Sequence, residues 1–404
     1  MGKIVLSPPS SIVVAPSSES AIRARRLHVA IAYWDPYTAG GVQSQVAGRL
    51  NSLGSREGPV RYTLFTREAP RGGSPWPHIR TIRFKGWDRG SIPIREYTAA
   101  RQLVRRLAEV HCDDPIDLVE MHASGFGPAV ARWARSERIP CLYVSHSLHC
   151  FERGSSGMRW DALWYYAWAN RRTAKECSRI LAVSHSLKQQ WLEQGVPSER
   201  VEVQHTATDG SCQVSSGPSH DLKTMQLLFV GRISPEKGLD VLIDAVDRCA
   251  TVKGLKIHLT VVGSIPDDHP LVHNVADRRV PVTFAGGMPN SAARSLMMEV
   301  DAVVIPSRHE YCPLVAIEAL QAGALIVASR VGGLPELIDD QETGILVPPG
   351  DAGALADVLC RIASHRSAWT SVRDAARIAG RRFTWSERGP QILELYYRLV
   401  SCGA

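Results

Sequence analysis

Long apolar segments are missing from this sequence of 404 residues. No run reaches the roughly 18 apolar residues of a membrane-spanning helix, so no such helix is expected. The nine cysteines include no Cys-x-x-Cys pair, so we expect reduced thiols in a cytoplasmic protein rather than a disulfide scaffold. Residues 1–26 are rich in Ser and Pro and lack the apolar core of a secretory signal, which predicts a flexible N-terminal tail.

Sequence patterns for metals and for nucleic acids are also absent. Cys and His do not recur at the paired spacings of metal sites, so no metal or other cofactor is expected. No block of five or more like charges is interleaved with aromatic residues, which argues against a nucleic-acid partner. Positive charge is instead concentrated in residues 1–210, which contain 28 Lys and Arg against 19 Asp and Glu. Such a basic half suits an anionic ligand or a peripheral contact with the inner face of a membrane.

Short apolar runs alternate with longer amphipathic stretches along nearly the whole chain. Several runs lack strict two-residue alternation, as strands do when helices cover both faces of a sheet. The Gly- and Ser-rich segment 208–221 predicts a hinge. We therefore predict an α/β fold of two doubly wound, Rossmann-like domains that face each other across a cleft. The expected strands cover 27–33, 60–66, 78–84, 117–122, 141–146 and 179–184, then 226–231, 256–263, 280–286, 301–307, 325–329 and 344–348.

Open sheets of this kind bind ligands at the carboxyl ends of their strands, where four motifs of this sequence lie. Gly40-Gly41 precedes a helical pattern, so the backbone can approach a ligand and the helix amides can face an anion. In the segment 230–246, a strand leads into a loop with Arg232 and Lys237, the charges that a diphosphate requires. Each of these two motifs is weak by itself, because glycine turns and surface cations are common.

The third motif is a strand that ends in a loop containing Glu310 and continues into a helix. Pro313 suits the first turn of that helix, and Glu318 follows on it. The amides of Leu314 and Val315 can hold a diphosphate, while Glu310 can reach a sugar and Glu318 can accept from ribose hydroxyls. Spacing alone leaves solvated surface positions as an equally good interpretation of the two glutamates.

A fourth motif, VGGLPELIDDQETGILVPPGD at 331–351, repeats the order of glycine pair, helix and strand. Together with GRISPEKG and HEYCPLVAIE, it resembles the donor domain of family 4 glycosyltransferases, retaining GT-B enzymes that use nucleotide sugars. AGGVQSQVAGRL and VSHSLHC resemble the family's first domain, and RRFTWSERGPQILELYYRLV resembles its terminal crossover helix. The resemblance implies an acceptor-binding domain at 27–210, joined by the crossover helix at 386–404, and a donor-binding domain at 211–385.

The resemblance also implies roles for individual residues. Arg232 and Lys237 would stabilise the departing diphosphate, and Glu310 would hold the transferred sugar. His146 matches the family's histidine near the reacting face of the sugar, so these four residues are the catalytic candidates. The implied donor-binding residues are Gly40, Gly41, Gly231, Arg232, Lys237, Gly263, Met288, Glu310, Tyr311, Cys312, Pro313, Leu314, Val315 and Glu318. The acceptor-binding candidates are Gln43, His122 and His146, although strand-end residues without a ligand role are commoner.

The implied reaction transfers a hexose or amino-hexose from a nucleotide sugar to a small polar or natural-product acceptor, with UDP favoured over GDP. No Asp-x-Asp pair occurs in the chain, so the cations and helix amides would take the place of a metal ion. Tyr311-Cys312 stands where the family has Gly-Phe or Pro-Phe, which leaves the identity of the sugar open.

Three alternatives remain compatible with the sequence. A membrane-associated transferase with a lipid-linked or phosphorylated envelope acceptor would use the aromatic stretch at 159–172, although such a stripe at helical spacing is more often a core helix. A GT-B nucleotide-sugar epimerase would consume the donor without an acceptor, and a non-catalytic sugar-nucleotide-binding protein would not consume it. The sequence leaves the oligomeric state open.

Overall fold

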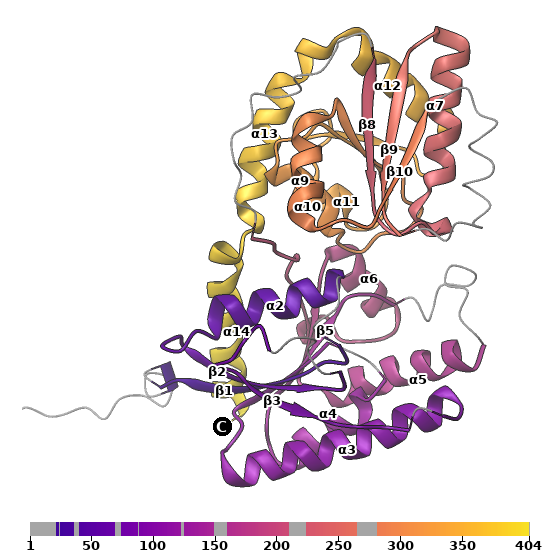
Figure 1. Ribbon diagram of the computed structural model, residues 1–404. Coiled ribbons are helices and arrows are strands. Elements are labelled where there is room, and N and C mark those ends of the chain that lie inside the picture. Colours follow the sequence, from indigo (N-terminus) through magenta and orange to yellow (C-terminus); the bar gives the residue numbers. More distant parts are fainter. Residues whose placement is uncertain are drawn as a thin grey trace, which may run out of the picture.

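Two parallel β-sheets, each covered by helices on both faces, form the two halves of the computed structural model (Figure 1). This arrangement confirms the predicted α/β fold of two doubly wound domains. The structure describes residues 22–23, 25–35, 40–68, 74–87, 89–122, 125–148, 160–209, 224–264 and 281–403. The greater part of the predicted hinge and of the predicted N-terminal tail lies outside the described residues.

The first sheet has the order β3-β2-β1-β4-β5-β6-β7, and every neighbouring pair is parallel. The chain therefore builds outward from β1 to β3 and then returns to place β4 beside β1. This reversal makes a crevice at the carboxyl ends of β1 and β4, where such sheets bind ligands. The strands are β1 Leu27–Ala32, β2 Val60–Thr66, β3 Arg80–Arg83, β4 Leu118–Met121, β5 Cys141–Ser145, β6 Arg179–Ala182 and β7 Val201–Val203.

The second sheet repeats this topology in the order β10-β9-β8-β11-β12-β13. Its reversal lies between β8 and β11, whose pairing is also parallel. The loops that follow these two strands carry the second and third sequence motifs, so the topology brings the motifs together. The strands are β8 Met225–Val230, β9 Ile257–Val262, β10 Val282–Gly286, β11 Ala302–Ile305, β12 Ile326–Ser329 and β13 Ile345–Val347.

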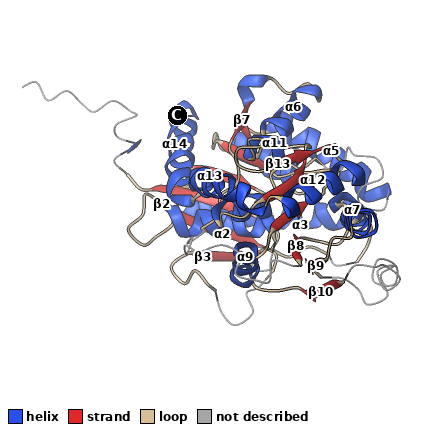
Figure 2. Ribbon diagram, turned by 90° about the horizontal axis from the view of Figure 1, so that it is seen from above, coloured by secondary structure: helices blue, strands red, loops and turns tan. Residues whose placement is uncertain are grey.

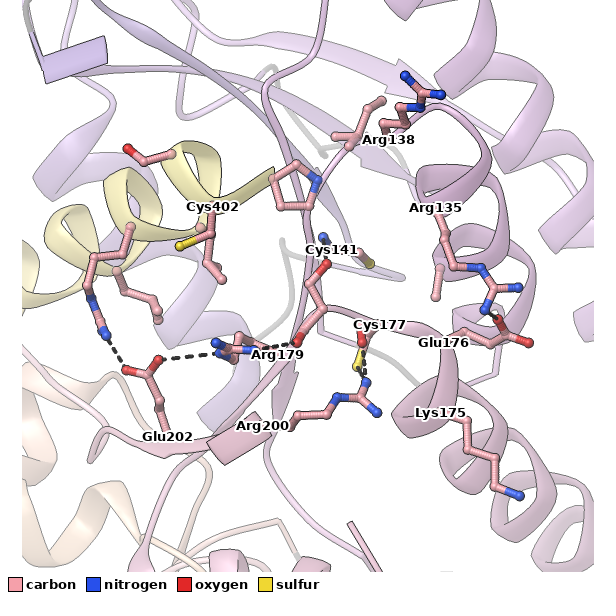
Figure 3. Close-up of a pocket in the computed structure, with 18 residues that line it drawn as sticks. Arg135, Arg138, Cys141, Lys175, Glu176, Cys177, Arg179, Arg200, Glu202 and Cys402 are labelled. Atoms are coloured by element: carbon pink, nitrogen blue, oxygen red, sulfur yellow. Dashed lines mark hydrogen bonds and ion pairs between the residues drawn. The ribbon is translucent and has the colours of Figure 1, made fainter. Parts of the chain in front are cut away.

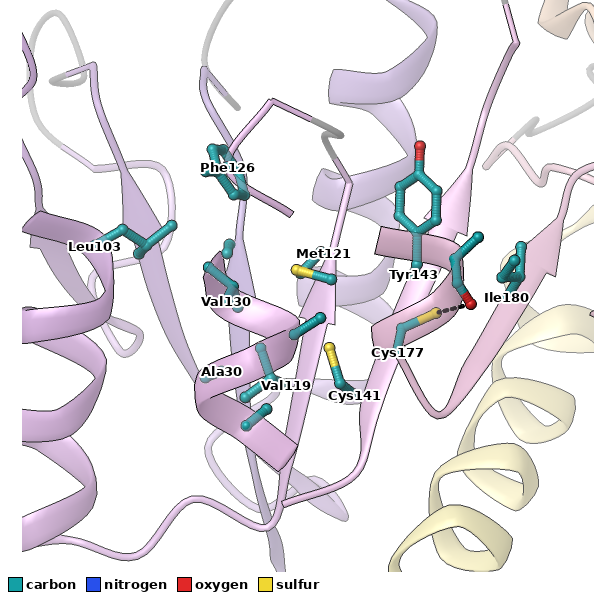
Figure 4. Packing of buried hydrophobic residues seen from close by; sticks show 14 of the residues in the cluster. Ala30, Leu103, Val119, Met121, Phe126, Val130, Cys141, Tyr143, Cys177 and Ile180 are labelled. Atoms are coloured by element: carbon teal, nitrogen blue, oxygen red, sulfur yellow. Dashed lines mark hydrogen bonds between the residues drawn. The ribbon is translucent and has the colours of Figure 1, made fainter. Parts of the chain in front are cut away.

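Helices pack on each face of both sheets, and Figure 2 shows them surrounding the strands when seen from above. The central strands are buried on both faces, which explains why their sequences lack strict alternation. On one face of the first sheet, Val119 and Tyr143 belong to a single buried cluster that also contains Leu103 and Val130 of the covering helices (Figure 4). The helices are α2 Gly41–Leu53, α3 Ile92–Asp113, α4 Gly127–Ser136, α5 Trp160–Glu176, α6 His185–Glu193, α7 Leu239–Lys253, α9 Asn290–Glu299, α10 Leu314–Gln321, α11 Leu334–Leu337, α12 Ala352–Ser364, α13 Thr370–Gly380 and α14 Trp385–Gly403. In the described part of the chain, 3₁₀ turns lie at Ser198–Arg200, Pro235–Lys237, Arg366–Trp369 and Arg381–Phe383.

The helix α14 leaves the second domain and packs against α2 and β4 of the first (Figure 1). Trp385 and Tyr396 are buried there, and the indole of Trp385 fills the space above Gly48, where a Cβ would lie within 2.0 Å of its nitrogen. Arg23 of the first domain also pairs with Glu394 of this helix, with an Nη2–Oε1 distance of 2.8 Å. The first domain is therefore completed by residues from the far end of the sequence.

The aromatic stretch at 159–172 differs from the expected core helix. Within α5, the side chains of Trp164 and Trp168 are exposed, at 78% and 48%. Tyr165 and Tyr166 are partly buried, and their hydroxyls donate to the carbonyl of Gly125 and to Glu96. Only one side of the aromatic stripe therefore contributes to the packing of the domain.

Candidate active site

The loops after β8 and β11 meet at a short ion pair between Lys237 and Glu310. The Nζ of Lys237 donates to Oε1 of Glu310 at 2.6 Å, and the hydroxyl of Ser307 donates to the same oxygen at 2.9 Å. Gly238 makes this approach possible, because it has a φ of 67° and a Cβ there would lie 2.0 Å from the carbonyl oxygen of Pro306. The structure thus brings together a cation and a carboxylate that are 73 positions apart.

Arg232 lies near this pair but is much more exposed. Its guanidinium is 3.5 Å from Oε1 of Glu236, and 74% of its side chain is open to solvent. A loose surface pair of this kind is held weakly. The side chain is therefore free to reorient toward an anion that arrives at the cleft.

The helix α10 begins directly after the Glu310 loop, with Pro313 as its N-cap residue. Within the described residues, no side chain caps this helix start. The first amides, those of Leu314 and Val315, are therefore available for a negatively charged group, and the helix dipole favours such a group there.

Glu318, one turn further along α10, is buried and pairs with Arg294 of α9 at 3.7 Å. Burial raises the pKa of Glu318, although the charge of Arg294 opposes the rise. Arg294 also donates to the hydroxyl of Thr208 and to the carbonyl of Asp209, the first two residues of the predicted hinge. The predicted ribose-binding carboxylate is thus connected to the segment that joins the two domains.

The glycine pair of the fourth motif, Gly332-Gly333, packs directly against the backbone of the Glu310 loop. A Cβ on Gly332, whose φ is 56°, would lie 1.6 Å from the carbonyl oxygen of Glu310. A Cβ on Gly333 would lie 2.0 Å from the carbonyl oxygen of Tyr311 and 3.1 Å from the Cβ of Ser184 in the first domain. Only glycine fits at either position, so the position of the Glu310 loop depends on this turn.

The remaining predicted residues of the second domain lie at strand ends. Gly231 and Gly263 end β8 and β9 side by side, where a Cβ on Gly263 would lie 2.0 Å from the carbonyl oxygen of Gly231. Met288 follows β10 and is partly buried against the α10 side of the core. Tyr311 and Cys312 differ from the others, because both pack against the core of the first domain. The thiol of Cys312 lies 3.1 Å from the hydroxyl of Thr206, and burial raises its pKa to about 11.

The first domain contributes the start of α2, where Gly40 is the N-cap residue and Gly41 begins the helix. A Cβ on Gly41 would lie 3.9 Å from Cδ1 of Leu314, so the starts of α2 and α10 approach each other across the cleft. Gln43 belongs to the first turn of α2. The glycine pair therefore leaves backbone amides close to the start of α10.

His122 and His146, at the carboxyl ends of β4 and β5, form one hydrogen-bonded series with Glu120. Nε2 of His122 lies 2.5 Å from Oε1 of Glu120, and Nδ1 of His122 lies 3.0 Å from Nε2 of His146. A carboxylate can only accept, so His122 donates to Glu120 and accepts from His146. Nδ1 of His146 then keeps its lone pair for a ligand.

Buried charges surround this series. Burial by itself raises the pKa of Glu120. The charge of Arg49, whose Nε lies 2.8 Å from Oε1 of Glu120, and the contact with His122 outweigh burial and lower this pKa to about 2. Burial lowers the pKa of both histidines, and His122 and Arg49 lower that of His146 further. Tyr396 of α14 donates to the other oxygen of Glu120. Both imidazoles are therefore neutral near pH 7.

Glu336 of α11 makes a second contact between the domains. Its carboxylate accepts from the amides of His185 and Ser186, at 2.7 and 2.8 Å, at the start of α6 in the first domain. Nε2 of His205, before the hinge, lies 2.9 Å from the same carboxylate. Burial raises the pKa of Glu336, but these hydrogen bonds outweigh burial and lower it.

Sequence reasoning missed the residues that support the predicted ones, chiefly Arg49, Glu120, Arg294 and Glu336. Glu120 alone gave a local signal, since it interrupts an apolar strand. The described residues contain no cluster of three or more Cys, His, Asp or Glu side chains suited to a metal ion. In the same part of the chain, every helix is too short or too polar to cross a membrane.

Two family models match the chain in consecutive halves. The model of Glycosyltransferase Family 4 matches residues 39–210, and that of Glycosyl transferases group 1 matches residues 224–365. A D-inositol 3-phosphate glycosyltransferase of Mycobacteroides abscessus is 26% identical over 95% of this chain and 91% of its own length. An alpha-D-kanosaminyltransferase of Streptomyces kanamyceticus is 26% identical over 77% of this chain and 82% of its own.

Solved structures show the same fold at lower identity. Sucrose-phosphate synthase from Thermosynechococcus elongatus aligns with a TM-score of 0.78 at 22% identity, over 93% of this chain and 100% of that one. Anabaena HepE in complex with UDP and glucose aligns with a TM-score of 0.71 at 20% identity, over 92% and 99%. Both likenesses extend over the two domains of this chain.

Proposed function

Because the chain belongs to the family 4 glycosyltransferases of the GT-B fold, we propose that it transfers a hexose or amino-hexose from a nucleotide sugar with retention of configuration. UDP is the favoured carrier, as in the HepE complexes to which the fold is similar. The acceptor is a small polar molecule, in keeping with a relative named for inositol 3-phosphate. An amino-hexose as the transferred sugar is in keeping with a relative named for the transfer of a kanosaminyl group.

The Lys237–Glu310 pair is the observation that carries the proposal. It stands at the reversal of the second sheet, next to the open amides of α10 and opposite the start of α2. A diphosphate at this place would meet Lys237 and the amides of Leu314 and Val315 at once. Glu310 would then accept hydrogen bonds from hydroxyls of the sugar.

The transfer breaks the bond between the anomeric carbon and the diphosphate oxygen, so negative charge develops on the leaving group. Lys237, Arg232 and the α10 amides would stabilise that charge, and a divalent metal ion would not be required. The acceptor oxygen would form the new bond on the same face and pass its proton to the departing phosphate. His146 would orient the reacting sugar or acceptor through the lone pair on Nδ1.

An activity assay with a panel of UDP-, GDP-, ADP- and TDP-sugars tests the proposal, after thermal shift has selected the donor that stabilises the folded chain. We expect Lys237→Ala to lower kcat by about 10²-fold or more, because charge stabilisation in the transition state is lost. Lys256→Ala is the matched control, since it removes an exposed lysine just before β9, at the amino-terminal ends of the strands of the same sheet. The wild type should keep its activity in excess EDTA. Near-normal turnover of Lys237→Ala would contradict the proposed site.

A further inference from the structure

A cavity of about 720 Å³ opens at the amino-terminal ends of β5, β6 and β7, away from the candidate active site. Cys141, the first residue of β5, lines the cavity, whereas His146 follows the last residue of the same strand. Five residues of strand span about 16 Å, so the two places are separate. Leu395, Leu399 and Ser401 of α14 form another wall.

The lining of this cavity is strongly basic. It contains two glutamates, and both already have partners: Glu176 pairs with Arg135 at 2.6 Å, and Glu202 pairs with Arg398 at 2.6 Å. Among the described residues, the cations Arg138, Lys175 and Arg200 form no ion pair with a carboxylate. The cavity therefore holds uncompensated positive charge. Its basic residues are Arg135, Arg138, Lys175, Arg179, Arg200 and Arg398.

The cations are arranged around the cavity rather than scattered. Figure 3 shows Arg179 and Arg200 in the middle, between Glu202 on one side and Glu176 on the other. The guanidinium of Arg200 donates to the carbonyl of Cys177, which fixes its position. Arg138 and Lys175 lie at opposite ends of the lining, and these two exposed side chains are here called the rim. Apolar side chains such as Ile139 complete the lining.

Arg138 occupies a backbone position that usually requires glycine. It follows the last turn of α4 with a φ of 58°, and the next amide, that of Ile139, bonds back to the carbonyl of Ala134 at 2.8 Å. A side chain in this left-handed conformation is less stable than glycine, which has no Cβ to clash with the backbone. The fold thus places a cation at the rim of the cavity at the expense of local backbone strain.

We propose that this cavity is a second ligand site, which binds a phosphate monoester with an apolar or ring-shaped body. A guanidinium group can donate two parallel hydrogen bonds to the oxygens of one phosphate, and Lys175 adds a mobile charge at the rim. The volume lies in the range of small-molecule sites, and the apolar lining suits the body of the ligand. The inference does not depend on the proposed transfer reaction.

Isothermal titration of the full chain with phenyl phosphate tests this site. We expect binding that weakens as the salt concentration rises, because the interaction is electrostatic. The rim variant Arg138→Gly with Lys175→Ala should weaken binding about tenfold or more, since the cavity loses two of its uncompensated positive charges. The fold should tolerate both changes, because both side chains are exposed and glycine relieves the backbone of residue 138.

Two controls locate the bound phosphate. Arg105→Ala with Arg106→Ala removes the same charge from the exposed face of α3 and should leave the affinity unchanged. Lys237→Ala removes a cation from the candidate active site and should also leave it unchanged. Absence of binding to the wild type, an equal loss in the α3 control, or loss in Lys237→Ala would overturn the proposal.

A further arm separates two sources of the phosphate. Binding of phenyl phosphate without co-sedimentation on phosphatidylcholine vesicles that contain phosphatidic acid would identify a free metabolite. Co-sedimentation that the rim variant abolishes would identify a lipid headgroup.

Discussion

At the scale of residues, the series Glu120–His122–His146 predicts how stability depends on pH. Burial lowers the folded-state pKa of both histidines, so below about pH 6.5 the unfolded chain binds more protons than the folded one. Stability should therefore fall with falling pH, by about 1.4 kcal/mol per pH unit for each histidine. Urea unfolding of the wild type and of His146→Gln between pH 7.5 and 5.5 measures this slope.

The variant should have the shallower slope, because one buried imidazole has been removed. His78→Gln, at an exposed position, is the matched control and should follow the wild type. Equal slopes for the wild type and His146→Gln would show that His146 takes up its proton without cost in the folded chain.

The candidate ligand-binding residues were easier to predict than the residues that hold them in place. Lys237 and Glu310 lie at strand ends within recognisable motifs, so the topology of a doubly wound sheet was enough to bring them together. Arg294 has no motif of its own, and its pairing with Glu318 depends on how α9 packs beside α10. Arg49 and Tyr396 reach Glu120 only because α2 and α14 cover the same sheet.

At the scale of elements, the turn before α11 predicts a strict requirement for glycine. Gly332→Ala would place a methyl group 1.6 Å from the Glu310 carbonyl oxygen, so the loop must move. We expect a loss of catalytic activity of about 10²-fold, because misplacement by about 1 Å has effects of that size. The kcat and melting temperature of the purified variant measure this effect.

Gly350→Ala separates backbone strain from displacement of the loop. Gly350 has a similar positive φ, 75°, but a Cβ there would meet no described atom within 4 Å. This variant should lose only about 1 kcal/mol of stability and keep its activity. A Gly332→Ala enzyme as active as Gly350→Ala would disprove the supporting role of the turn.

The order and type of the described strands other than β7 followed from the sequence, while β7 and the exposure of α5 did not. Strands buried on both faces have a plain apolar signature, and each predicted run in the described residues contains a strand. Trp164 and Trp168 recur at helical spacing as core residues would, yet they face solvent. Periodicity marks one side of a helix as apolar but cannot say whether another element covers that side.

At the scale of the whole molecule, Glu336 predicts how firmly the two domains hold each other. Glu336→Gln removes the charge that accepts from the α6 amides and from His205. The free variant should populate more open arrangements, with a larger radius of gyration in X-ray scattering and a kcat/KM about tenfold lower. Glu342→Gln changes an exposed carboxylate a few residues later and should change neither. Unaltered scattering of Glu336→Gln would contradict this role.

The return of α14 to the first domain has a consequence for synthesis on the ribosome. Strand β4 leaves the ribosome early, but the hydroxyl that reaches its Glu120 and the indole that covers Gly48 are encoded more than 250 codons later. Until then the buried apolar cluster that α14 shares with β1, β2 and α2 is incomplete, and Glu120 lacks its hydrogen bond from Tyr396. Chaperones that bind exposed apolar surface would therefore have a binding site on the first domain throughout translation of the second.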